Sequence, residues 1–183
     1  IGALFLSLAV AAVFAGLSQW QLDRAFTKDQ PAAEKLVTQK VSVKFDTANA
    51  YVISNRLQKG ELGYWLVANT FIPSGKSQTI ALGWSKDLNE IEQERSALMS
   101  SGLEKYETKL EGVLIPTEAP LHQKESKPYI LESPSLAQLL NLYSPDKPLA
   151  TEPQILALNG SSQASAWPPL APIDVHYIKG ETI

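Results

Sequence analysis

The chain begins with an unbroken apolar stretch and continues with shorter segments in which apolar and polar positions alternate. Residues 1–17 contain no charged side chain. A helix that continues from there to Trp20 would be roughly 30 Å long at about 1.5 Å per residue, which matches the hydrocarbon thickness of a bilayer. Trp20 and the charges that follow it resemble the aromatic belt of a membrane interface. The pattern predicts a transmembrane helix over residues 1–22, followed by a juxtamembrane helix or linker over residues 23–40.

Two other interpretations of the apolar stretch remain open. A signal peptide has a similar apolar run, and Val13-Phe14-Ala15 offers small residues near a cleavage point. A helix buried in a protein core is the second alternative, because the stretch is apolar on all sides and has no polar stripe. Its length favours the membrane span.

The segments after residue 40 carry the pattern of a β domain. Apolar and polar residues alternate from Val41 to Phe45, as they do in a half-buried strand. Gly60 and Gly63 are expected to mark a loop before the next long apolar run. The full set of expected strands covers residues 41–45, 50–56, 64–72, 79–84, 106–115, 129–131 and 154–158.

Two helices are expected within this domain. Residues 89–100 are charged and helix-prone, and Gly102 follows them as a terminating glycine. Residues 134–140 predict a short helix with Pro134 in its first turn. We therefore predict an α+β fold class: an N-terminal transmembrane helix and then a mostly antiparallel β domain, a partly closed barrel or curled sheet, with one or two short helices.

The same pattern predicts the domain organisation. A soluble β-rich domain is expected over residues 41–160. Residues 161–183 form a C-terminal segment that is rich in Pro and Ala, which is typical of an extended linker. This segment is a candidate lead into a second membrane helix.

Composition narrows the function classes. With 183 residues, 44% of them hydrophobic and 19% charged, the chain has the composition of one folded domain after an anchor. Its net charge of −3 and its scattered basic residues argue against a nucleic-acid partner. Because there are no cysteines, disulfides and thiolate chemistry are excluded.

Candidate catalytic motifs do not meet their structural requirements. Ser74-Gly75-Lys76-Ser77 ends like a phosphate-binding loop, but Thr70 stands where the earlier glycine is required, so a hairpin turn is expected. His122 and His176 have no metal-ligand spacing, and His122 is expected to be exposed. The acidic residues Glu90, Glu92 and Glu94 are expected on a solvated helix face. We therefore expect no catalytic activity, no metal and no resident cofactor.

Several motifs, in order, carry a resemblance to a known family. They are Gln19-Trp20-Gln21-Leu22-Asp23-Arg24 with Lys28, then Val52-Ile53-Ser54-Asn55-Arg56 with Gly60-Glu61-Leu62-Gly63-Tyr64-Trp65, Ala81-Leu82-Gly83-Trp84, and Leu110-Glu111-Gly112-Val113-Leu114. Over roughly the first two thirds of the chain these segments resemble the surfeit locus protein one family. The members of that family are membrane-anchored factors for assembly of haem-copper cytochrome c oxidase.

The resemblance implies an assembly or accessory factor of this oxidase, or a stably bound accessory subunit of the oxidase or of a respiratory supercomplex. The implied partners are subunits of these complexes and membrane lipid. The implied location is the bacterial plasma membrane or the mitochondrial inner membrane, with the β domain on the outer face. His176 becomes a candidate for binding haem a, the alternative being an ordinary surface histidine.

Trp20, Arg24 and Lys28 recur at a spacing of four residues, which places an aromatic ring and two cations on one helix stripe. This stripe is expected to contact headgroups or an acidic partner surface; simple interfacial anchoring is the alternative. By contrast, Tyr64, Trp65 and Trp84 are expected in the core of the β domain.

The chain also departs from the family pattern. Leu82 replaces an arginine and Lys86 stands in place of a proline, so no role of that arginine is transferred. A different class of function also stays open, namely an anchored extracytoplasmic module that binds a small ligand inside the β domain.

Overall fold

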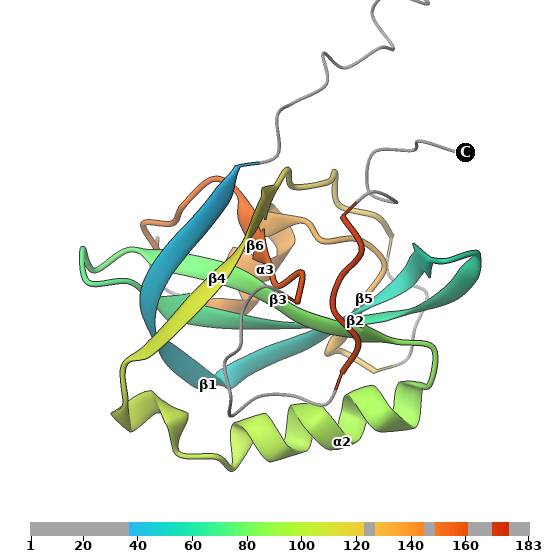
Figure 1. Ribbon diagram of the computed structural model, residues 1–183, viewed down its shortest axis with the longest axis horizontal. Helices are drawn as coiled ribbons and strands as arrows, with labels where there is room; N and C mark the ends of the chain where they lie inside the picture. The colour runs from blue at the N-terminus through green and yellow to red at the C-terminus, as the bar shows by residue number, and fades with distance from the viewer. Residues whose placement is uncertain (1–36, 123–126, 145–148, 161–169, 176–183) are drawn as a thin grey trace, which may run out of the picture. The chain divides into compact units, whose positions relative to one another are not determined.

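The computed structural model describes residues 37–122, 127–144, 149–160 and 170–175, and these residues form one β-rich unit (Figure 1). Its elements in chain order are β1 (Thr38–Gln58), β2 (Glu61–Phe71), β3 (Ser77–Ser85), α2 (Leu88–Met99), the 3-10 helix η1 (Leu103–Lys105), β4 (Thr108–Ile115), β5 (Ile130–Leu131), α3 (Leu136–Tyr143) and β6 (Ile155–Ala157).

The sheet closes on itself around the long strand β1. The first part of β1 pairs with β4 and the second part pairs with β2, both antiparallel. The remaining ladders connect β2 to β3, β3 to β6 and β6 to β4, so the pairing returns to β1. β5 adds a short parallel ladder to β1. The change of partner along β1 is accompanied by a register shift between Asp46 and Ala50, where the strand bends.

The predicted fold class is wrong. The sheet is mixed, because β5 runs parallel to β1 and β6 runs parallel to β3. Both strands are short and reach the sheet after long connections, and such connections permit parallel pairing whereas tight hairpins do not. In the described part of the chain, no helix is long and apolar enough to cross a membrane. The expected span over residues 1–22 lies outside the described residues.

Each face of the sheet packs into its own apolar cluster. Along β2, Leu66 and Ala68 point into a cluster that α2 covers, whereas Trp65 and Val67 point into a cluster that α3 covers. This division follows from the alternation of side chains along a strand. Because both faces are buried, the central strands have nearly continuous apolar sequences rather than alternating ones.

Both expected helices form, with ends that the sequence explains. The Asp87 side chain accepts a hydrogen bond from the Asn89 backbone N–H and caps the start of α2. After the helix, Gly102 has a φ of 70°, the left-handed conformation that favours glycine. On α3, Leu136, Leu139 and Tyr143 are buried at helical spacing against the sheet.

Candidate functional site

The residues that the sequence singled out for membrane, partner or haem contact are not placed by the structure. Trp20, Arg24, Lys28 and His176 all lie outside the described residues. Among the described residues, His122 is exposed, as expected. The candidate site consists of three of the described motif segments, residues 52–56, 60–65 and 81–84, whereas residues 110–114 lie within β4 (Thr108–Ile115).

These segments meet at the hairpin that joins β1 to β2, which extends beyond the rest of the sheet (Figure 1). Lys59 and Gly60 form a two-residue turn with φ values of 51° and 79°. Positive φ at both central residues matches the type I′ turn that suits the twist of a hairpin. The strands then pair Gln58 with Glu61 and Leu57 with Leu62. The expected loop is thus a tight turn, and Gly63 lies within β2.

Gly63 is the point at which Trp84 of β3 packs against the hairpin. A Cβ atom on Gly63 would lie 2.5 Å from the Ser85 backbone oxygen and 2.7 Å from the Trp84 ring. The indole N–H of Trp84 donates to the backbone oxygen of Arg56, at 2.9 Å. Glycine is therefore required here because an aromatic ring and a backbone oxygen occupy the space of a side chain.

Three groups hold the Arg56 side chain: the Trp65 ring, the Ser54 backbone oxygen and the Glu118 carboxylate. Its guanidinium lies 5.4 Å from the centroid of the Trp65 ring, which allows a cation–π contact. Its Nε donates to the Ser54 backbone oxygen at 3.1 Å, and an Nη lies 2.6 Å from the Glu118 carboxylate. The arginine side chain is only 14% exposed. Its charge is therefore balanced by Glu118, and its contacts help to position the hairpin.

A bulge in β1 aims Arg56 in this direction. The register with β2 shifts between Ile53 and Arg56, and Asn55 has a φ of 57°. The Asn55 side-chain amide donates to the carboxylate of the buried Glu132, which helps to hold this uncommon backbone conformation. The bulge turns the strand so that the Arg56 side chain reaches Trp65.

Residues Leu170–Val175, which we name the C-terminal strap, lie against the same structure. Ala171 and Trp84 exchange two backbone hydrogen bonds, at 2.9 and 3.1 Å. A Cβ atom on Gly83 would lie 2.5 Å from Cβ of Leu170, so the strap packs directly on the glycine. Ile173 and Val175 are buried. Leu170–Val175, within the segment expected to be a linker, therefore packs on the β-rich unit.

Gln58 fastens the strap to the hairpin. It is 5% exposed, its Nε2 donates to the Pro172 backbone oxygen at 2.9 Å, and its Oε1 accepts from the Asp174 backbone N–H at 3.0 Å. The side-chain amide thus forms with the strap two hydrogen bonds of the kind that the backbone of a neighbouring strand would form. Nothing in the local sequence signals this contact, because its partners lie more than one hundred positions away.

Replacing Gln58 with leucine is expected to loosen the strap, because two hydrogen bonds are lost while the side-chain volume is kept. The free energy of unfolding should fall by about 1–2 kcal/mol. Amide hydrogen exchange at Asp174 should accelerate more than exchange within β3. The matched control is Gln39→Leu, since Gln39 lies exposed on the same strand. If both variants changed the free energy of unfolding and the exchange at Asp174 equally, Gln58 would not be what holds the strap to the hairpin.

The Gly-Lys-Ser segment is a hairpin turn, as expected. Gly75 has a φ of 84°, its backbone N–H donates to the Ile72 oxygen at 2.9 Å, and the turn joins the antiparallel strands β2 and β3. Lys76 pairs with Glu152 at 3.1 Å. A phosphate-binding loop would require a strand-to-helix turn here.

The acidic face of α2 is not simply solvated. Glu92 accepts hydrogen bonds from the Lys127 ammonium, at 2.5 Å, and from the Tyr129 hydroxyl, at 3.0 Å. The bond from Lys127 holds the pKa of Glu92 below its usual value. Arg95 lies 4.2 Å from the Tyr129 ring centroid and donates to the Ala50 backbone oxygen. This cluster fixes the segment before β5 to α2, which is a structural role.

Two further observations bear on chemistry. Within the described ranges, no three His, Cys, Asp or Glu side chains gather as a metal site would require. The hydroxyl of Tyr143 lies 3.4 Å from the Thr79 hydroxyl, and burial raises the Tyr143 pKa above its usual value. A tyrosine of this kind stays protonated and does not serve as a base near neutral pH.

The structure also explains what Leu82 and Lys86, which depart from the family pattern, do in this chain. Leu82 is buried in the apolar cluster under α2, so a charged side chain does not fit that position without a partner. Lys86 is exposed and pairs with Glu61 at 3.3 Å, which adds one more link between β3 and the hairpin.

Comparison of the chain with known protein families, with characterised proteins and with solved structures finds no match. The resemblance to the surfeit locus protein one family therefore depends on its motifs alone.

Proposed function

We propose that this protein is an assembly or accessory factor of haem-copper cytochrome c oxidase, which acts by binding the oxidase or a respiratory supercomplex and not by catalysis. One observation supports this proposal above the others. Arg56 and Gly63, from one motif of the resemblance, and Trp84, from another, pack on one another where β3 meets the β1–β2 hairpin. Residue types shared with a family by chance would have no reason to gather in one structural unit.

The contacts of the hairpin also fix its position and leave its surface to meet a partner. The Arg56 charge is balanced by Glu118, and the aromatic rings of Trp65 and Trp84 are packed against the arginine and Gly63. Such an element presents a fixed surface to a partner. The proposal places the protein at the plasma membrane or the mitochondrial inner membrane, where the oxidase itself resides.

The test is affinity purification of the tagged full-length protein from mild-detergent membranes, followed by quantitative mass spectrometry and a haem spectrum. Recovery of oxidase subunits in nearly equal amounts would identify an accessory subunit. Recovery of a small fraction, enriched in immature oxidase, would identify an assembly factor. Absence of every oxidase subunit would refute the proposal.

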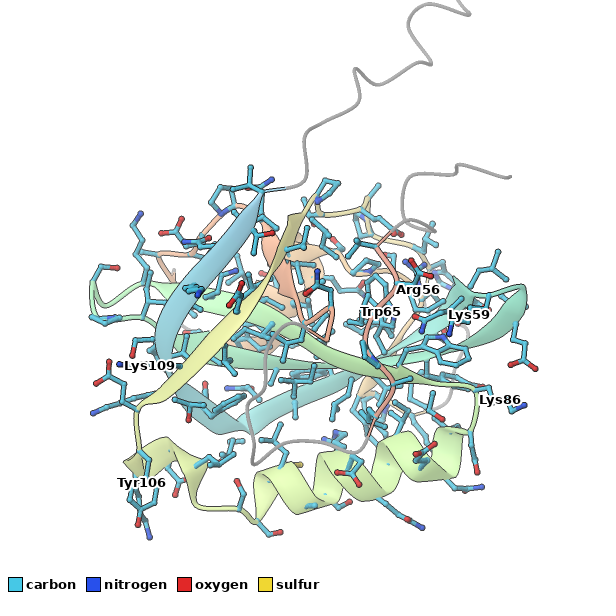
Figure 2. All side chains as sticks on the ribbon, in the orientation of Figure 1. Arg56, Lys59, Trp65, Lys86, Tyr106 and Lys109 are labelled. Atoms are coloured by element: carbon cyan, nitrogen blue, oxygen red, sulfur yellow. The ribbon has the colours of Figure 1, made fainter. Side chains whose placement is uncertain are left out.

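A pair of variants tests whether the β1–β2 hairpin contributes to binding of the oxidase. Gly63→Ala displaces the hairpin from Trp84 and is expected to reduce oxidase recovery. Tyr106→Ser is the matched control, because Tyr106 is exposed and lies far from the hairpin (Figure 2). Both proteins are compared at a temperature at which circular dichroism shows them folded.

A further inference from the structure

The tip of the β1–β2 hairpin exposes two leucine side chains next to one another. Leu57 and Leu62 are directly opposite in the antiparallel register and are 49% and 66% exposed. Residues in such a pair have Cβ atoms about 5 Å apart, so the two side chains form one apolar surface. We name them the tip pair.

The tip pair is held in a fixed orientation by the opposite face of the hairpin. Gln58 alternates with Leu57 along β1, and Gly63 alternates with Leu62 along β2, so both point away from the tip pair. On that side Gln58 binds the strap and Gly63 contacts Trp84. Because these contacts hold the opposite face against the domain, Leu57 and Leu62 remain exposed to solvent.

Basic side chains flank the tip pair. Lys59 occupies the turn itself, is exposed, and forms no ion pair with the described residues. Lys86 is also exposed, and Glu61 balances its charge. Figure 2 shows Lys59 and Lys86 at the same end of the molecule as Arg56. Since Glu118 balances the Arg56 charge, Lys59 supplies the positive charge at the turn itself.

The size and shape of this surface favour lipid over a protein groove. Two partly exposed leucines offer on the order of 200 Å² of apolar surface, whereas a stable protein interface buries roughly 800 Å² on each partner. A projecting tip needs no shape-complementary partner to enter the interfacial layer of a bilayer. A lysine beside it can extend its ammonium to the phosphate groups while its methylenes stay in the apolar layer.

We propose that the tip pair inserts into the interface of an anionic lipid bilayer, with Lys59 at the headgroup phosphates. This goes beyond the proposed function, which concerns a protein partner and says nothing of where the domain meets lipid. The contact would orient the β domain on the membrane surface.

The absence of cysteine in the chain allows a local test. A single cysteine is introduced as Leu62→Cys in the full chain and labelled with an environment-sensitive nitrobenzoxadiazole probe. Tyr106→Cys, labelled in the same way, is the matched control at the far end of the domain. Because residues 1–17 are apolar and can bind lipid by themselves, the local probe is the readout and co-sedimentation is not.

With phosphatidylcholine vesicles that contain phosphatidylglycerol, the probe at position 62 should shift to the blue and become protected from aqueous iodide. The probe at position 106 should not change. Adding Lys59→Gln should weaken the response to anionic vesicles by about fivefold and leave the response to phosphatidylcholine alone unchanged. A Leu57→Cys probe repeats the measurement with Leu62 intact.

Three outcomes would overturn the proposal. The probe at position 62 could stay open to iodide on vesicles, or the two positions could respond equally. The probe could also respond to detergent-solubilised oxidase and not to protein-free vesicles, which would assign the tip pair to a protein contact. The first two outcomes leave the oxidase proposal standing, because no oxidase is present in them.

Discussion

Replacing Gly63 with alanine is expected to lower the free energy of unfolding by about 3 kcal/mol, at the upper end of what overpacking usually costs. The new methyl group would lie 2.5 Å from a backbone oxygen of Ser85, which is fixed by the β2–β3 ladder and does not move aside as a flexible side chain would. The Trp84 ring is the next nearest group, at 2.7 Å. Urea unfolding followed by circular dichroism measures the change.

Gly60→Ala is the matched control for this prediction. Gly60 lies three positions away in the same hairpin, and nothing is within 4 Å of the position that a Cβ atom would take. Its φ of 79° still penalises alanine by roughly 1–2 kcal/mol. A cost at Gly63 no larger than the cost at Gly60 would show that the hairpin yields to the methyl group, and would remove close packing as the reason for the glycine.

The local sequence predicts the turn of the β1–β2 hairpin but not the contacts that hold the hairpin in place. Lys59-Gly60 between equally spaced leucines is a hairpin signal in the local sequence, whereas Gly60 and Gly63 by themselves predict only a loop. The role of Gly63 depends on Trp84, about twenty positions later, and no local pattern specifies that contact. The same holds for Gln58, whose partners belong to a segment that its Pro and Ala content marked as a linker.

The sheet topology was missed for a similar reason. The segments around residues 129–131 and 154–158 were expected as strands, and β5 and β6 form there. Their short apolar sequences specify a strand but not its neighbour or direction, because those depend on which open edge of the sheet remains when the segment returns. β6 fills the gap between β3 and β4, where Gly112 permits close approach to Ala157.

The candidate site was predicted only in part. Helical spacing identified Trp20, Arg24 and Lys28 as a contact stripe, and these residues lie outside the described part of the chain. The motifs around Arg56 and Trp84 were recognised by resemblance, without a physical role. The structure gives them one, since the arginine, the glycine and the tryptophan together fix the hairpin that carries the exposed Leu57 and Leu62.

Replacing Trp84 with alanine is expected to lower the free energy of unfolding by about 3–4 kcal/mol, within the range of large-to-small aromatic substitutions. The ring packs on Gly63, and its N–H satisfies the Arg56 carbonyl. Trp84→Phe keeps most of the packing and removes the donor, so it should cost about 1–2 kcal/mol. Both variants keep the backbone hydrogen bonds to Ala171, so amide exchange should rise in the hairpin before it rises in the strap.

A double-mutant cycle joins this prediction to the first one. In the Trp84→Ala protein, the ring that blocks a methyl group at position 63 is gone, while the Ser85 oxygen remains. Gly63→Ala should therefore cost less in that background than in the natural protein, but more than zero. A coupling free energy of about 1 kcal/mol or more is expected for residues in such close contact. Strict additivity would mean that the two residues do not act as one unit, and the hairpin would then owe its position to other contacts, above all the Arg56–Glu118 pair.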